Sequence, residues 1–160
     1  MTRWLTAAEQ EVWRAFLEAT RVLQTTLDGQ LQREADMPHG YYEILVRLSE
    51  VPGRAMRMRD LADATGSSRS RLTHAVDKLE ERGWLCRQDC EDDRRGQVAR
   101  LTDKGFAVLS DAAPGHVAQV RAALFDPLTP EQVAALGVIC RAVVAGPAGQ
   151  AGPSTGSRHC

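Results

Sequence analysis

The chain has 160 residues, of which 43% are hydrophobic, 26% are charged and only 5% are aromatic. This length and composition suit one compact globular domain. No run of about 18 apolar residues is present and the first residues lack the apolar core of a signal peptide, so we predict a cytoplasmic protein without a membrane span. Four scattered cysteines fit free thiols in a reducing compartment.

The net charge of −1 excludes a protein that is coated with positive charge, but the basic residues are unevenly distributed. Eleven of the 20 lysines and arginines lie in residues 54–100, and all of these except Lys78 are arginines. Nine acidic residues share this segment, so its own balance is only slightly positive. We therefore expect a local, shaped basic surface in this part of the chain.

Hydrophobic periodicity predicts a long first helix from Thr6 to Glu34. Apolar side chains recur along it every three or four residues, at Val12, Phe16, Ala19, Leu23, Leu27 and Leu31. Thr6 and Glu9 have the spacing of a capping box, which marks the helix start. A helix of this length measures about 40 Å. Because a domain of this size cannot bury the whole stripe, part of it is expected to contact a second subunit.

The next helices are shorter. A second helix begins at Pro38 and ends before Pro52-Gly53, a pair of residues that stops helices. After a short extended stretch, the pattern predicts a short helix at residues 60–64 and a longer one at 69–82, which Gly83 terminates.

The last third of the chain predicts a hairpin and two helices. Two segments of strand character, residues 84–88 and 97–101, flank a polar loop as in a β-hairpin. Thr102 caps the next helix, which we expect to be broken or bent near Pro114. Thr129 begins the final helix, since it is followed by a proline in the first turn.

Residues 60–83 have the pattern of a helix-turn-helix. Gly66 lies where a tight turn requires a positive φ, and Leu72, Val76 and Leu79 form the inward stripe of the second helix. An ordinary amphipathic helix with a solvated polar face would share this stripe, but the turn and the following hairpin favour a DNA-reading helix. Its polar groups suit base edges and phosphates in a major groove. The predicted DNA-binding residues are Ser67, Ser68, Arg69, Ser70, Arg71, Thr73, His74 and Lys78.

The hairpin that follows this helix has the position of the wing in a winged helix-turn-helix. Its tip contains Asp93, Arg94 and Arg95, which we also predict to bind DNA. A narrow minor groove attracts guanidinium groups, and Arg95 is expected to enter one. An acidic residue beside DNA is useful only if it orients a cation, so we expect Asp93 to hold Arg95 by a salt bridge.

The segment from about Arg57 to Gly105 resembles the MarR (multiple antibiotic resistance regulator) family of winged-helix transcription factors. The matching pieces are Met58-x-x-Leu61-Ala62, Ser70-Arg71-Leu72-Thr73, Asp77-Lys78-Leu79-Glu80-x-Arg82-Gly83, Asp93-Arg94-Arg95 and Leu101-Thr102-x-x-Gly105. The long first helix and the two closing helices extend the resemblance over roughly residues 6–145. It implies a homodimer with intertwined first and last helices that binds a pseudo-palindromic operator in double-stranded DNA, commonly as a repressor. Small aromatic ligands often release members of this family from DNA.

The predicted fold is therefore mainly α with a small β-hairpin wing, an α+β arrangement. Residues 36–101 form the winged helix-turn-helix DNA-binding domain in this prediction. Residues 1–35 and 102–145 form a helical dimerisation region, and residues 146–160, rich in glycine and proline, form a disordered tail.

Aromatic side chains of the first two helices are candidates for an effector site. They are Trp13 and Phe16 on the first helix, and His39 and Tyr42 at the start of the second. In the resembled fold these regions approach a cleft between the dimerisation and DNA-binding parts, and such a lining suits a planar ligand. The alternative is that Trp13, Phe16 and Tyr42 are core residues.

Other functions receive less support from the sequence. The four histidines are far apart and no catalytic motif is present, so we predict no enzyme, no cofactor and no metal site. Cys86 and Cys90 match no zinc-binding spacing. The family's oxidant sensors resemble one another in having a cysteine in the first helix, and this chain has none before Cys86. The alternative function is a winged-helix module for protein contacts without sequence-specific DNA binding, and salt-dependent DNA binding would distinguish the two.

Overall fold

The computed structural model describes residues 2–90 and 93–146, and the side chains of Cys90 and of residues 93–95 lie outside the described part. The predicted tail at 146–160 also lies outside it, except for Gly146. The elements in chain order are α1 (Ala7–Ala35), α2 (His39–Ser49), the 3-10 turn η1 (Pro52–Arg54), β1 (Ala55–Arg57), α3 (Met58–Ala64), α4 (Arg69–Glu81), β2 (Leu85–Cys90), β3 (Asp93–Leu101), α5 (Asp103–Val120), the π-helical η2 (Arg121–Phe125) and α6 (Pro130–Ala145).

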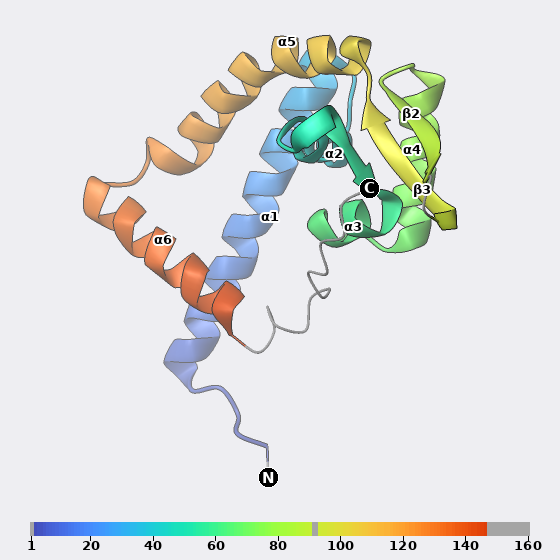
Figure 1. The fold of residues 1–160 in the computed structure, drawn as a ribbon. Coiled ribbons are helices and arrows are strands. Elements are labelled where there is room, and N and C mark those ends of the chain that lie inside the picture. Colours follow the sequence, from blue (N-terminus) through green and yellow to red (C-terminus); the bar gives the residue numbers. More distant parts are fainter. Residues whose placement is uncertain (1, 91–92, 147–160) are drawn as a thin grey trace.

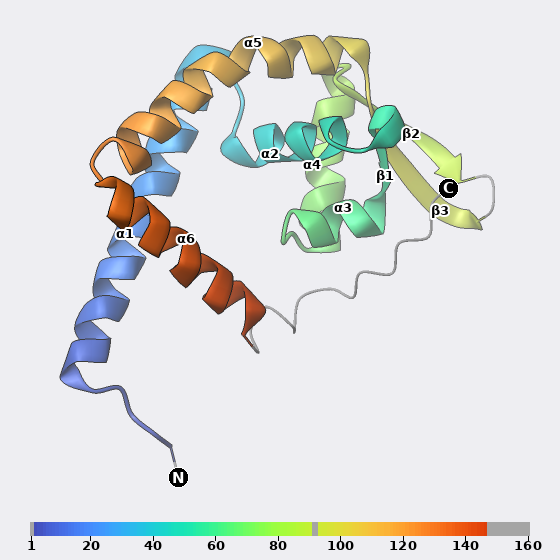
Figure 2. The same cartoon turned by 60° about the vertical axis from the view of Figure 1, so that its left-hand side comes forward.

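The described elements form a lobe and an arm. The lobe contains α2, α3, α4 and the three strands, and the arm consists of α1, α5 and α6, which extend away from the lobe (Figure 1). Figure 2 shows the same separation from a second direction. The mainly helical fold with a β-hairpin wing is thus confirmed. The division into residues 36–101 and a helical dimerisation region stays a prediction.

Local capping explains where the helices begin. In α1 the Thr6 hydroxyl accepts from the Glu9 amide at 3.2 Å, while the Glu9 carboxylate accepts from the Thr6 amide at 2.7 Å. Thr129 and Gln132 repeat this capping box at α6, and the Thr102 hydroxyl caps α5 by accepting from the Gly105 amide at 3.0 Å. These caps satisfy backbone donors that the first turn of a helix leaves unpaired, as the sequence predicted.

The sheet contains one strand more than the predicted hairpin. Its order is β1-β3-β2, and both pairings are antiparallel. β2 and β3 form the wing, with Leu85 opposite Leu101 and an irregularity between Asp89 and Cys90. The short β1 pairs with the other edge of β3 and places Arg57 opposite Val98. Because β1 has only three residues, period-2 alternation could not identify it.

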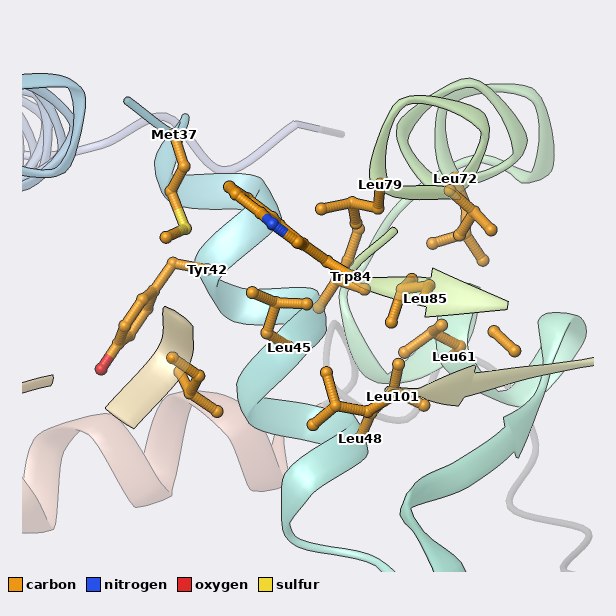
Figure 3. Close-up of a cluster of buried hydrophobic side chains, with 14 of the residues drawn as sticks. Met37, Tyr42, Leu45, Leu48, Leu61, Leu72, Leu79, Trp84, Leu85 and Leu101 are labelled. Atoms are coloured by element: carbon orange, nitrogen blue, oxygen red, sulfur yellow. The ribbon is translucent and has the colours of Figure 1, made fainter. Parts of the chain in front are cut away.

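One apolar core holds the lobe together (Figure 3). The inward residues predicted for α4, Leu72, Val76 and Leu79, are all buried in it. Each buried side chain of this size contributes about 1.5–3 kcal/mol relative to an exposed one. Besides Leu72 and Leu79, Figure 3 labels Met37, Tyr42, Leu45, Leu48, Leu61, Trp84, Leu85 and Leu101 of this core.

The helix was predicted to be broken or bent near Pro114, and the structure shows no break there. α5 continues through Pro114 to Val120, and the irregular backbone follows at the π-helical Arg121–Phe125. Proline removes one amide donor from the helix, but this turn lies tightly against α1. A Cβ on Gly115 would lie 2.4 Å from Glu34 Oε2. We infer that packing against α1 compensates for the missing hydrogen bond.

The arm leaves much apolar surface uncovered in a single chain. The buried residues of α1 are confined to its C-terminal third, and α6 contributes none. We call the remaining surface the apolar arm face. It is formed by Val12, Trp13, Phe16, Leu17 and Val22 of α1 and by Val138, Ile139, Val143 and Val144 of α6. Large apolar side chains exposed in this number along two helices are typical of an interaction site.

Among the described residues, no single helix has both the length and the apolarity that a membrane span requires. Only the segment Asp103–Phe125 taken together with Pro130–Ala145 meets that requirement, and the two are bent by 97°.

Candidate nucleic-acid interface

The turn between α3 and α4 presents α4 at the surface of the lobe. Gly66 has a φ of +59°, the left-handed conformation that the sequence predicted for it. Ser68 is the N-cap of α4, and its hydroxyl accepts from the Arg71 amide at 3.3 Å. Burial of the apolar stripe then turns the opposite face of α4 to solvent.

The structure brings the predicted α4 residues to this outer face. All are exposed except Ser67, which is half-buried. Within the described residues, the side chains of Arg69, Arg71 and His74 have no hydrogen-bond or ion-pair partner. The Thr73 hydroxyl donates to the Arg69 carbonyl at 2.8 Å. Unpaired guanidinium and imidazole groups next to short hydroxyls supply the donors that base edges and phosphates accept.

Lys78 differs from these residues because it is paired. Its ammonium lies 2.8 Å from the Glu81 carboxylate. The hydrogen bond to Glu81 and its charge raise the pKa of Lys78. The pair is exposed and weak in water, but it offsets positive charge at the C-terminal half of α4.

Arg87 on β2 is a structural residue of this interface that the sequence analysis did not single out. Its side chain is only 20% exposed, and its guanidinium forms ion pairs with Asp77 and Glu80 of α4. It also donates to the Thr73 carbonyl at 3.1 Å, while its backbone amide donates to Glu80 at 2.6 Å. Arg87 thereby fixes the wing to α4. The sequence signal for this contact was the i, i+3 spacing of two carboxylates on a helix, followed by an arginine in the next strand.

Three arginines from three elements line a groove between α4 and the base of the wing. Arg57 comes from β1, Arg59 from α3 and Arg69 from the start of α4. We call this feature, with a volume of about 360 Å³, the arginine groove. The sequence analysis selected Arg69 and missed the other two, because only tertiary contacts bring β1 and α3 beside α4.

The wing tip remains a prediction. Residues 93–95 belong to the backbone of β3, but the side chains of Asp93, Arg94 and Arg95 lie outside the described part. The salt bridge expected between Asp93 and Arg95 is therefore untested.

The four effector-site candidates separate into two groups. Trp13 and Phe16 stack with ring centroids 6.3 Å apart and are exposed on the arm, whereas Tyr42 is buried and contacts His116. His39 also lies near His116, at 5.5 Å between centroids. Gln30 contacts His116 and follows Phe16 by fourteen residues on α1, a separation of about 21 Å along the helix axis. In one protomer the four side chains therefore do not line one pocket, and Tyr42 is a core residue.

His116 belongs to a small polar cluster where α1, α2 and α5 meet. Burial lowers the pKa of His116, and the charge of His39 acts in the same direction. Burial raises the pKa of Tyr42. Both shifts favour uncharged side chains, as expected where water is excluded.

The two cysteines whose side chains the structure describes form no disulfide bond. Cys86 is half-buried and Cys140 is exposed, and both are free thiols. No group of three or more His, Cys, Asp or Glu side chains in the described part is arranged to hold a metal ion.

The exposed second helix of a helix-turn-helix, attached to a three-stranded sheet with a projecting hairpin, defines a winged helix-turn-helix protein. A MarR family profile matches residues 35–96. Sco3205, a MarR family transcriptional regulator from Streptomyces coelicolor, has been crystallised in complex with DNA, and its sequence is 56% identical to this chain. The two structures superpose with a TM-score of 0.86, and the match covers 90% of each chain. AbsC from the same organism is 43% identical with a TM-score of 0.83, over 89% of this chain and 96% of AbsC. This chain belongs to the MarR family.

A curated relative matches over a shorter stretch. The transcriptional repressor MprA of Escherichia coli is 36% identical over 70 residues, which is 44% of this chain and 40% of MprA. The match thus spans less than half the length of that repressor. The named relatives are transcriptional regulators, and the expectation that this chain is not an enzyme agrees with its family.

Proposed function

We propose that this protein is a dimeric transcriptional regulator of the cytoplasm that represses genes by binding a pseudo-palindromic operator in double-stranded DNA. The observation that carries the proposal is the outer face of α4, where Arg69, Arg71 and His74 are exposed and have no side-chain partner among the described residues. The 56% identity to a regulator crystallised with DNA supports the same use of this face.

In the proposed complex α4 enters the major groove of one half-site. Arg71 and His74 lie on its exposed face and read base edges, where a good bidentate contact discriminates by about 1–3 kcal/mol. The serines at the start of α4 contact phosphates. Arg95 on the wing enters the adjacent minor groove with Asp93 as its orienting partner.

The apolar arm face is the proposed dimer interface. In one protomer the side chain of Val143 on α6 is 63% exposed and that of Val12 on α1 is 70% exposed. Leaving this apolar surface in contact with water costs free energy, which burial against a second protomer would recover. A symmetric dimer would cover both helices and would present two α4 helices to half-sites about 34–36 Å apart. The two-fold symmetry of such a dimer is why we propose a palindromic operator.

A small aromatic acid or phenol is proposed to weaken operator binding by favouring a dimer whose α4 helices are wrongly spaced. Such a ligand must bind the DNA-incompetent form more tightly, since equal affinity for both forms shifts nothing. Trp13 and Phe16 stack within the apolar arm face, so in the proposed dimer a ligand that contacts them would bind between the two protomers. The test is a thermal-shift screen of aromatic acids followed by operator titrations. Compounds that stabilise the protein without changing operator affinity would contradict this role.

The experiment that tests DNA recognition is selection of duplexes from a random pool by the purified protein. Enrichment of a palindrome is expected, and its half-site spacing reports the distance between the two α4 helices. If no sequence is enriched and no salt-dependent binding is detected, the alternative of a winged-helix module for protein contacts is favoured instead.

A further inference from the structure

The end of α4 is connected to the arm by a series of hydrogen bonds. Most of α4 packs within the lobe, on α3 and β2. The carbonyl groups of Arg82, Gly83 and Trp84, which follow its last turn, all accept hydrogen bonds from the start of α5. The donors are, in the same order, the Lys104 ammonium at 2.8 Å, the Thr102 hydroxyl at 2.8 Å and the Thr102 amide at 3.0 Å. Because a helix leaves its last carbonyl groups without partners, α5 completes the hydrogen bonding where α4 ends.

The side chain of Arg82 extends this connection to α1. Its guanidinium donates to the Asp36 carbonyl at 2.6 Å and lies 3.4 Å from the Asp36 carboxylate. It also lies over the Trp84 ring, 4.9 Å from the ring centroid. Asp36 is the C-cap of α1 with a φ of +47°, and the next residue, Met37, is fully buried in the core of the lobe. Arg82 therefore contacts the point at which the arm helix α1 enters the lobe.

We propose that Arg82 is a positioning residue for operator binding, which holds α4 in a fixed direction relative to the arm. Arg82 contacts the end of α1 through its guanidinium and the start of α5 through its carbonyl oxygen. In the proposed dimer the two arms form the interface, so the direction of α4 relative to its own arm sets the distance between the two α4 helices. This inference rests on the proposed function and adds to it a residue that fixes the half-site spacing.

Arginine suits this position because its planar guanidinium can donate to more than one acceptor and stack on an aromatic ring at the same time. The ion pair alone would contribute little, since the Asp36 side chain is 89% exposed to water. The hydrogen bond to the Asp36 carbonyl and the contact with Trp84 add a fixed geometry. We therefore expect the loss of Arg82 to change the orientation of α4 more than the free energy of unfolding.

The test measures how strongly the dimer discriminates between half-site spacings. A labelled duplex selected from a random pool is compared with duplexes of the same length in which its half-sites are one or two base pairs closer or farther apart. Each base pair changes their separation by about 3.4 Å. A scrambled duplex reports binding that does not depend on sequence. The spacing ratio, defined as the affinity for the selected spacing divided by that for an altered one, is expected to be large in the unaltered protein.

Arg82→Met removes the guanidinium donors and keeps most of the side-chain length. It should lower the spacing ratio by about fivefold or more, the range typical of coupling between linked sites. Lys104→Met removes the hydrogen bond to the Arg82 carbonyl and should lower the ratio in the same direction. Arg82→Lys keeps the charge without the planar group and should recover only part of the ratio. The loss of a cation weakens binding to all duplexes alike, so it cancels in the ratio.

Arg47→Met is the matched control, because the ion pair of Arg47 with Glu43 lies within α2. It removes the same charge from the lobe without changing the connection to the arm, and it should leave the spacing ratio unchanged. Urea denaturation of each variant separates positioning from stability, since a residue that only stabilises the fold would lower the free energy of unfolding and keep the ratio. Lys104 is exposed, so Lys104→Met decides the matter if Arg82→Met does not fold.

The outcomes separate the two proposals. If Arg82→Met and Lys104→Met keep the spacing ratio of the unaltered protein, the positioning role is wrong while the regulator proposal stands. An equal fall of the ratio in Arg47→Met would also overturn the positioning role, because the effect would not depend on the connection between α4 and the arm. If the unaltered protein binds all spacings alike or binds no duplex, the proposed function fails and the positioning role fails with it.

Discussion

The imidazole of His116 on α5 lies against the ring of Tyr42 on α2, with centroids 4.3 Å apart and ring planes inclined by 44°. Its Nδ1 lies 3.4 Å from Oε1 of Gln30 on α1. His116 is 8% exposed and Gln30 is 1% exposed. One histidine thereby connects two helices of the arm with the first helix of the lobe.

This contact predicts a pH-dependent stability. Burial lowers the pKa of His116 in the folded protein below the value of about 6.5 for an unfolded chain. Below that pH the unfolded state binds more protons, so the free energy of unfolding falls as the pH decreases. We expect urea denaturation to give a lower stability at pH 5.5 than at pH 7.5, and His116→Gln to reduce that difference. His74→Gln, which replaces an exposed histidine, is the control, and an unchanged pH dependence in His116→Gln would contradict the assignment.

Gly105 is predicted to tolerate no side chain. A Cβ at this position would lie 2.1 Å from the Trp84 carbonyl oxygen and 2.8 Å from Leu101 Cδ1. Gly105→Ala should destabilise the protein by about 2–4 kcal/mol, measured by urea denaturation, since backbone must move to relieve the overlap. Gly40→Ala is the control because nothing lies within 4 Å of its Cβ, and it should be neutral or slightly stabilising. Equal effects of the two substitutions would show that the close approach at Gly105 is wrong.

Substitutions on α4 should separate base reading from charge. Arg71→Ala and His74→Ala are expected to reduce discrimination between the selected and scrambled duplexes, by about 1–3 kcal/mol for a lost bidentate contact. Lys78→Ala should weaken both duplexes alike, and only slightly, because Glu81 already neutralises part of its charge. Fluorescence anisotropy with each duplex measures both effects. The assigned recognition face is wrong if the three variants lower both affinities equally.

A charge on α6 should prevent dimerisation. Ile139 and Val143 are one turn apart and are 58% and 63% exposed. Ile139→Glu combined with Val143→Glu should convert the protein into a monomer of 17.5 kDa in light scattering, since a dimer would bury both carboxylates. Arg47→Glu places a new carboxylate on α2 and should leave the dimer intact. A double variant with the mass of the unaltered protein would exclude α6 from the interface.

Arg87 is expected to stabilise the attachment of the wing. Arg87→Met removes the ion pairs with Asp77 and Glu80 while keeping most of the side-chain volume. Two partly buried carboxylates then lose their partner, at a cost of about 1–3 kcal/mol in the free energy of unfolding. Hydrogen exchange should report faster opening of β2 than in the unaltered protein. Arg121→Met, which removes an ion pair with Asp126 away from the wing, is the comparison, and equal protection of β2 in both variants would contradict the role of Arg87.

Local sequence determined the helices and the surface of α4. The Thr6–Glu9 and Thr129–Gln132 capping boxes act between residues three apart, so they are visible without a structure. The same is true of Leu72, Val76 and Leu79, whose spacing decides which face of α4 is buried. The outward residues, Arg71 and His74 among them, follow from that choice. Family membership was accessible for a similar reason, because its motifs lie within one continuous segment.

Only the tertiary structure decided which distant residues meet. Gln30 and His116 are 86 positions apart, and the arginine groove joins β1, α3 and α4. Arg87 meets Asp77 and Glu80 through the packing of β2 on α4, while α5 stays helical through Pro114 where it lies close to α1. Periodicity describes which face of one element is buried, but it carries no information on which other element covers that face. The clusters that several elements share therefore depend on how the whole chain packs.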